Sequence, residues 1–261
     1  MEKVRNPISV ETVKVPVQMD KIAPLGRIGL LALATDFNSE QDLRRMLPEG
    51  LEIFTNRIKN ANPTTIENLR TMAGDITRAA AGILPELGVD AMIYGCTSGT
   101  IAIGTEKLNE LIHAAWPGIP TTNPIVAAQA AFDAFGASRL SVLTPYIDEV
   151  NEEMARYFLA QGHDLLNIAG FGFENDIEMT SISPETLLQA AQEVCDERAD
   201  LLFISCTALR ASLAIERIEQ ALGKPVVTSN QALCWHVLQL LGHELQVPGF
   251  GSLFTKGLKT G

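Results

Sequence analysis

Two stretches of the sequence, residues 91–100 and 201–210, share one pattern of apolar and polar positions. Each has a run of four apolar residues, a small residue, a Cys-Thr pair and then a helix-like segment. A continuous apolar run of this length, ended by a turn signal, is typical of a buried parallel strand. The pattern therefore predicts that Cys96 and Cys206 each lie at the carboxyl end of a strand and the amino end of a helix.

The rest of the chain alternates between short apolar runs and longer helical segments. Further strands are predicted at residues 27–33, 51–55, 119–122 and 139–143. Helices are predicted at residues 39–47, 64–87, 99–115 and 125–135. Residues 1–25 are predicted to form an N-terminal arm, which is either a flexible leader or a short edge strand.

The order of elements repeats within the chain. The strand that begins at Arg27 has a counterpart at Arg139, 112 positions later, and the same offset pairs Asp36 with Asp148. Self-similarity at one spacing indicates a duplicated architecture. We therefore expect an α/β fold with two pseudo-symmetric halves, each a small parallel sheet flanked by helices. The two Cys-Thr corners would then face each other across a cleft between the halves.

The composition limits the partners that the protein can have. Of the 261 residues 46% are hydrophobic, and the formal net charge is -11. Nucleic acids and anionic membranes require a basic face, so neither is expected as a partner, whereas local donors can still bind a small acidic substrate. No apolar run approaches the length of a membrane span, and residues 1–24 lack the apolar core of a signal peptide.

The cysteines lie far apart, without the spacing of a disulfide scaffold or a metal site; they are Cys96, Cys195, Cys206 and Cys234. We therefore expect free thiols and a cytoplasmic location. Cys195 and Cys234 lie in helix-like segments and are assigned to packing. The histidines have no metal-ligand spacing and the glycines form no nucleotide-binding motif, so neither a metal nor a cofactor is expected.

Cys96 and Cys206 are the candidate catalytic residues. A lone cysteine is more often a buried packing residue, but a matched pair at two strand ends favours catalysis. A helix N-terminus stabilises an anion, so we expect each thiol to have a lowered pKa. Two thiols on opposite faces of a planar carbon can racemise it by moving a proton. Alternatively, one thiolate adds to an activated double bond and the other thiol handles the proton, which allows rotation and elimination.

Both reactions build negative charge on a carboxylate or an enolate, which hydrogen-bond donors must stabilise. The candidate donors are the hydroxyls of Thr97, Ser98 and Thr207, whose alternative role is to cap helices. Tyr146, at the end of the strand that opens the second half, either binds a substrate carboxylate or satisfies a backbone group. Asp36 lies at the equivalent corner of the first half.

These residues resemble the Asp/Glu racemase superfamily, and in particular its branch of maleate cis-trans isomerases and arylmalonate decarboxylases. The resemblance covers nearly the whole chain from Gly26 onward. It is carried by four motifs, which are residues 95–99 (Gly-Cys-Thr-Ser-Gly), residues 144–146 (Thr-Pro-Tyr) with Asn151, residues 205–207 (Ser-Cys-Thr) and residues 228–232 (Thr-Ser-Asn-Gln-Ala).

The resemblance implies a cofactor-independent enzyme with two flavodoxin-like domains and an active site between them. It also implies that the helix after Asn230 returns to the first domain. The expected domains are residues 26–126 with 229–261, and residues 127–228. The resemblance further implies a homodimer or a higher homo-oligomer.

Roles for individual residues are implied as well. Cys96 corresponds to the attacking thiolate of the family and Cys206 to its proton partner. Tyr146 is expected to bind a substrate carboxylate, and Asn151 and Asn230 are expected to belong to the substrate-binding set. Arylmalonate decarboxylases lack the first cysteine, so the presence of both disfavours a decarboxylase.

Asp36 departs from the pattern of maleate isomerases, which have an asparagine at this position. A carboxylate there would repel a dicarboxylate and would suit a substrate that carries an amine. The segment Thr-Asp-Phe-Asn around Asp36, together with Phe-Thr-Asn-Arg at residues 54–57, is similar to ectoine-utilisation proteins that are related to maleate isomerases.

Three functions follow as hypotheses. The first is a two-cysteine isomerase of a small carboxylate, with the conversion of maleate to fumarate as the family default. The second is a racemase of an amino or imino acid linked to ectoine catabolism, which Asp36 favours. The third is a regulatory module that binds a small carboxylate without turnover.

Overall fold

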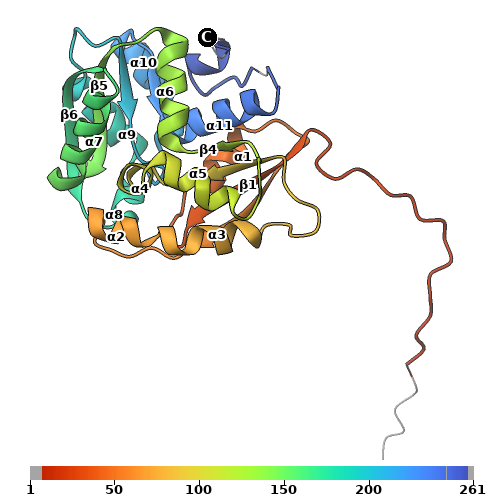
Figure 1. Cartoon of the computed structure of the whole chain (residues 1–261). Coiled ribbons are helices and arrows are strands. Elements are labelled where there is room, and N and C mark those ends of the chain that lie inside the picture. Colours follow the sequence, from red (N-terminus) through yellow and green to blue (C-terminus); the bar gives the residue numbers. More distant parts are fainter. Residues whose placement is uncertain (1–7, 245, 258–261) are drawn as a thin grey trace, which may run out of the picture.

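The computed structural model describes residues 8–244 and 246–257, which form two four-stranded parallel sheets flanked by helices (Figure 1). The strand order is β2-β1-β3-β4 in the first sheet and β6-β5-β7-β8 in the second. The strands are β1 (Gly26–Leu33), β2 (Leu51–Ile58), β3 (Ala91–Tyr94), β4 (Thr121–Thr122), β5 (Arg139–Tyr146), β6 (Asp164–Phe173), β7 (Leu201–Ile204) and β8 (Val226–Thr228). The predicted α/β fold with two matching parallel sheets is confirmed.

The repeat extends to the register of the strands. In the first sheet Ile28 of β1 lies opposite Ala91 of β3, and in the second Leu140 of β5 lies opposite Leu201 of β7. Ile28 and Leu140 are separated by the same 112 positions that the sequence pattern shows. The central strand pairs of the two halves therefore have the same register.

An ion pair marks the start of each central strand pair. The Arg27 guanidinium lies 3.1 Å from the Asp90 carboxylate, and the Arg139 guanidinium lies 2.6 Å from the Asp200 carboxylate. Each aspartate also accepts a hydrogen bond from the backbone N–H of its arginine. The arginine thereby holds the loop before the third strand of each half in register.

The helices differ from the prediction mainly where glycine interrupts them. They are α1 (Ser39–Met46), α2 (Ile66–Thr71), α3 (Ala73–Ala81), α4 (Thr97–Ile103), α5 (Thr105–His113), α6 (Pro124–Phe135), α7 (Asp148–Ala160), α8 (Asp176–Ser181), α9 (Pro184–Val194), α10 (Ile215–Leu222) and α11 (Ser229–Leu240), with short 3-10 turns η1 (Ala211–Leu213) and η2 (Ser252–Thr255). The single helix predicted at residues 99–115 is divided at Gly104, whose φ of 93° is not helical. The one predicted at residues 64–87 is divided at Met72 and ends before Gly82.

Two helices join the halves. Helix α6 leads from the first sheet into the second, and α11 follows the last strand and packs against α6 and α1. Residues 229–238 of α11 are all buried, because the helix has neighbours from both halves on every side. One hydrophobic core therefore runs through both sheets, and a second, smaller core lies under α2, α3 and α5.

The N-terminal segment stands apart from this core. Residues 8–22 are exposed, have no regular secondary structure and extend away from the sheets (Figure 1). Along residues 8–244 and 246–257, the structure contains no helix with the length and apolar character that crossing a membrane requires.

Candidate active site

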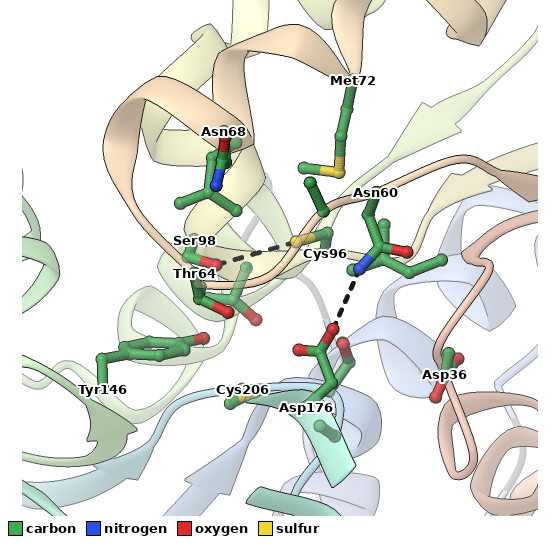
Figure 2. A pocket seen from close by; sticks show the side chains of 16 residues that line it. Asp36, Asn60, Thr64, Asn68, Met72, Cys96, Ser98, Tyr146, Asp176 and Cys206 are labelled. Carbon is green, nitrogen blue, oxygen red and sulfur yellow. Dashed lines mark hydrogen bonds between the residues drawn. The ribbon is translucent and has the colours of Figure 1, made fainter. Parts of the chain in front are cut away.

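A pocket lies between the two halves at the carboxyl ends of their strands. Its walls include Leu33 at the end of β1, Cys96 after β3, Tyr146 at the end of β5 and Cys206 after β7. Figure 2 shows Cys96 and Cys206 on opposite sides of this pocket. Parallel α/β sheets place their ligand sites at this edge. The structure thus brings the two predicted cysteines to one site.

Cys96 lies at the start of a helix, as the sequence pattern predicts. It is the N-cap residue of α4, and its Sγ accepts a hydrogen bond of 3.2 Å from the Gly99 N–H. The Ser98 hydroxyl lies 3.7 Å from the same sulfur. A Cβ on Gly99 would lie 2.9 Å from this sulfur and 2.5 Å from Tyr94 Oη, so glycine is required for this approach.

Cys206 differs, and the helix predicted to follow it is absent. Its φ is 110°, which L-residues rarely adopt, and the segment after it is a turn that leads to η1. The Asn38 side-chain amide donates to the carbonyl oxygens of Thr207 and Leu209 at 3.1 and 2.9 Å. Asn230 donates to the Thr207 carbonyl at 2.9 Å. These two amides bind carbonyls that a helix would otherwise use, which explains the wrong prediction.

Asp42 supports both amides from within the protein. Its Oδ2 accepts hydrogen bonds from Asn38 at 3.1 Å and from Asn230 at 3.0 Å, and its side chain is fully buried. Burial raises the pKa of Asp42, and the Asn230 and Asn38 donors oppose this rise. Asn230, which was expected to belong to the substrate-binding set, is not among the lining residues of the pocket and donates to the Cys206 turn.

Hydrogen bonds also tie the two cysteine corners to each other. The Thr207 hydroxyl donates to the Gly95 carbonyl at 3.0 Å. The Ser229 hydroxyl oxygen accepts from the Cys206 N–H and from the Thr97 hydroxyl, both at 3.0 Å. The hydroxyl protons of Thr97 and Thr207 are therefore used within the protein, and these residues line the pocket without being free donors. Ser229, which joins the two corners, was not identified from the sequence.

Tyr146 and Asn151 divide the roles that were expected of both. Tyr146 is 2% exposed, lines the pocket, and its Oη has no hydrogen-bond partner among the described residues. Asn151 lies behind it, where its Oδ1 accepts from Thr144 at 2.6 Å and its Nδ2 donates to the Tyr146 carbonyl at 3.1 Å. Tyr146 is thus placed to bind a ligand, whereas Asn151 positions the strand end and does not line the pocket.

Two aspartates contribute to the pocket lining. Asp36 accepts hydrogen bonds from the N–H groups of Asn38 and Ser39 and from the Ser39 hydroxyl, so both of its oxygens support the start of α1. Asp176, at the start of α8, was not identified, because the preceding strand β6 is only half-buried and gives a weak apolar pattern. In the part of the chain that the structure describes, no three or more His, Cys, Asp or Glu side chains are grouped to hold a metal.

The thiol pKa values contradict the prediction that both are lowered. Burial raises the pKa of Cys96 and of Cys206 to about 12. For Cys96 the Gly99 N–H and the Ser98 hydroxyl act in the opposite direction but are outweighed. The Asp176 carboxylate raises both thiol pKa values further. The protein therefore holds both groups as thiols at neutral pH, and a thiolate needs a positive group or further donors nearby.

Known proteins are similar to this chain in sequence and in architecture. The chain is 24% identical to the maleate isomerase of Alcaligenes faecalis over 247 residues, which cover 88% of this chain and 96% of that protein. Two solved structures are similar. One is the maleate isomerase Iso of Pseudomonas putida S16, solved as a cysteine-to-alanine variant with maleate. It has a TM-score of 0.82 and 22% sequence identity, and the match covers 89% of this chain and 98% of that chain. The other is a cysteine-to-serine mutant of the Nocardia farcinica maleate cis-trans isomerase with a covalently bound succinylcysteine intermediate. It has a TM-score of 0.80 and 20% sequence identity, and the match covers 87% of this chain and 97% of that chain.

The family is decided by a match along most of the sequence. Residues 47–254 match the model of the arylmalonate decarboxylase family. This range includes both cysteines, the Tyr146 corner and Asn230 at the start of α11. It agrees with the resemblance drawn from the sequence motifs. The chain therefore belongs to the arylmalonate decarboxylase family.

Proposed function

We propose that the protein is a cofactor-independent isomerase that uses Cys96 and Cys206 to interconvert the cis and trans forms of a small unsaturated carboxylate. The observation that carries this proposal is the placement of the two thiols on opposite sides of one buried pocket (Figure 2). The similarity to maleate isomerases supports it, and so does the succinylcysteine intermediate of the Nocardia farcinica enzyme.

The reaction begins at Cys96, whose thiol loses its proton to water when the substrate binds. The resulting Sγ thiolate forms a bond to one alkene carbon, and the electron pair of the double bond moves to the neighbouring carbon and its carboxylate. The Cys206 thiol gives a proton to that neighbouring carbon. Rotation about the resulting single bond follows, after which the Cys206 thiolate takes the proton back and the C–S bond breaks. No electrons are gained or lost overall, so the proposal includes no cofactor.

Three groups assist these steps. The Gly99 N–H and the Ser98 hydroxyl stabilise the Cys96 thiolate, because each lies within reach of its sulfur. The Tyr146 hydroxyl donates to the substrate carboxylate, on which negative charge builds during the addition. Its Oη has no partner among the described residues, so this donor is free for the substrate.

Proton NMR in D2O tests the reaction type. The protein is incubated with maleate, with cis-4-aminobut-2-enoate and with single enantiomers of small amino acids. Conversion of the vinyl signals of a cis acid to those of its trans isomer is expected. Exchange of an α-hydrogen without any vinyl conversion would establish the racemase instead. Ligand binding with no conversion, unchanged in Cys96→Ser and Cys206→Ser, would establish a binding module.

The proposal extends to the assembly and location of the enzyme. Both thiols must stay reduced for the addition to occur, so we place the reaction in the cytoplasm. A homodimer, which the family resemblance implies, is tested by the mass of the protein in solution from light scattering.

A further inference from the structure

The charge of the pocket is not the charge that a dicarboxylate requires. The lining contains the carboxyl groups of Asp36 and Asp176, and it contains no Lys, Arg or His among the residues that the structure describes. The nearby Arg57 guanidinium is used elsewhere, because it donates to the backbone carbonyls of Leu33 and Asp36 and pairs with Glu40. A second carboxylate on a substrate would therefore meet negative charge without a protein cation beside it.

Asp176 is the carboxylate that faces the reacting groups. It is 8% exposed, and its Oδ2 accepts hydrogen bonds from the Thr35 hydroxyl and from Asn60 Nδ2, the latter at 2.9 Å. Its Oδ1 has no partner among the described residues. Figure 2 shows this carboxylate between the Cys96 side and the Cys206 side of the pocket. One oxygen is thus left for a ligand next to the thiols.

A free donor lies at the other end of the pocket. Figure 2 shows the ring of Tyr146 pointing into the pocket from the side opposite Asp36, with Asp176 between them. The Tyr146 hydroxyl is buried and has no partner among the described residues, so the pocket has an unused hydrogen-bond donor there. The pocket therefore has a donor end at Tyr146 and Ser98 and an acidic end at Asp176 and Asp36.

We propose that Asp176 determines the substrate class and that the substrate is a small zwitterion, whose carboxylate lies at Tyr146 and whose ammonium group lies against Asp176. This inference rests on the proposed function, since it names the substrate of the same two-cysteine site. An ammonium group at this place gives the buried Asp176 its missing counter-charge. A dicarboxylate of the same length would place its second carboxylate against Asp176.

The thiol chemistry supports the same assignment. The Asp176 carboxylate opposes ionisation of Cys96 and of Cys206. An ammonium group between Asp176 and the sulfurs offsets that charge and favours the attacking thiolate. The substrate would thus supply the positive charge that the pocket lacks, and the thiolate would form when a substrate of the right class binds.

Binding of two saturated, unreactive analogues tests the proposal without any turnover. The probes are 4-aminobutanoate and succinate, which share a four-carbon chain and differ by an ammonium group in place of one carboxylate. We expect isothermal titration calorimetry to show that the wild-type protein binds 4-aminobutanoate more tightly by about thirty-fold or more, as for a buried charge pair. Equal or tighter binding of succinate, or no binding of 4-aminobutanoate, would overturn the proposal, whatever the enzyme does with unsaturated acids.

Variants separate recognition of charge from a structural role. Asp176→Asn keeps an acceptor for Thr35 and Asn60 and removes the charge, so it should reverse the preference toward succinate. Glu178→Gln removes an exposed charge from the same helix and should leave the preference unchanged. Equal weakening of both probes by Asp176→Asn, at unchanged circular dichroism, would show that Asp176 only joins the two halves. If Asp176→Asn does not fold, the wild-type comparison of the two probes decides.

Discussion

The two cysteine corners have the same sequence pattern and different backbones. Cys96 caps a helix in ordinary extended geometry, and its sulfur accepts the Gly99 N–H. Cys206 has a φ of 110° and is followed by a turn that Asn38 and Asn230 hold from other elements. A duplicated strand and cysteine therefore carry two different local structures.

The difference in backbone suggests different chemical roles for the two thiols. A sulfur that already accepts an N–H hydrogen bond is prepared for negative charge, which suits the attacking group at Cys96. Burial raises the pKa of the Cys206 thiol to about 12, so this thiol retains its proton and suits the role of proton donor. Its backbone is strained, and a turn rather than a helix follows it.

The largest expected effect on activity comes from replacing each cysteine sulfur by a serine oxygen. Cys96→Ser should reduce kcat by about 10⁴-fold or more, because it removes the nucleophile. Cys206→Ser should reduce kcat by about 10² to 10⁴-fold, as for loss of a general acid–base group. Steady-state kinetics on the acid identified by NMR measures both. Cys195→Ser is the control and should have wild-type kinetics, because its side chain lies outside the pocket lining. A smaller loss from Cys96→Ser than from Cys206→Ser would reverse the assigned roles.

Gly99→Ala tests the close packing around the Cys96 sulfur at the first corner alone. Its Cβ would lie 2.7 Å from Met72 Cε and 2.9 Å from Cys96 Sγ, so the thiol must move. A displacement of this size should reduce kcat/KM by about 10²-fold. The equivalent position of the second corner is Leu209, which is a buried leucine rather than a glycine, and the volume-conserving change Leu209→Met should retain most activity. Wild-type kinetics in Gly99→Ala would show that the reaction does not depend on the present position of the Cys96 sulfur.

The backbone of each corner can be loosened separately. Asn38→Ala removes donors from the carbonyls of Thr207 and Leu209 and from Asp42, and should lower the unfolding free energy by about 2 to 3 kcal/mol. Thr100→Val removes the single bond from the Thr100 hydroxyl to the Cys96 carbonyl, and should lower it by about 1 kcal/mol. Urea unfolding measures both. Equal losses would mean that the Cys206 turn needs no special support.

The smallest difference in stability between the two halves is expected at their Arg–Asp ion pairs. The guanidiniums of Arg27 and Arg139 lower the pKa values of Asp90 and Asp200, so each carboxylate contributes stability above its unfolded pKa near 4. That contribution is lost as the pH falls through the folded pKa. Asp200→Asn should destabilise more than Asp90→Asn at pH 7, because Asp200 is less exposed and also accepts the Ser138 N–H. Thermal melts between pH 7 and pH 3 measure this: the difference should begin to shrink as the pH falls below the unfolded pKa near 4, and a difference that stays constant over the whole range would exclude the carboxylate charge as its cause.

Local patterns were enough to predict most of the strands, the repeat and the positions of Cys96 and Cys206, but not the half-buried strand β6. An apolar run followed by a small residue specifies a strand end without information from elsewhere in the chain. The turn after Cys206 could not be predicted in this way, because it is held by a hydrogen bond from Asn38, which lies in the first half of the molecule. The prediction of lowered thiol pKa values was wrong for a similar reason. Burial and Asp176 come from distant segments and outweigh the local donors.

The covalent adduct formed by Cys206→Ser shows whether Cys96 is the attacking nucleophile. The variant is mixed with the cis acid that the wild-type protein isomerises, quenched in acid, and measured by intact-mass and peptide mass spectrometry. We expect a mass increase of one substrate molecule, located on Cys96, and no increase in a Cys96→Ser, Cys206→Ser double variant. An adduct on Cys195 or Cys234, or an active enzyme whose Cys96 never carries substrate, would contradict it.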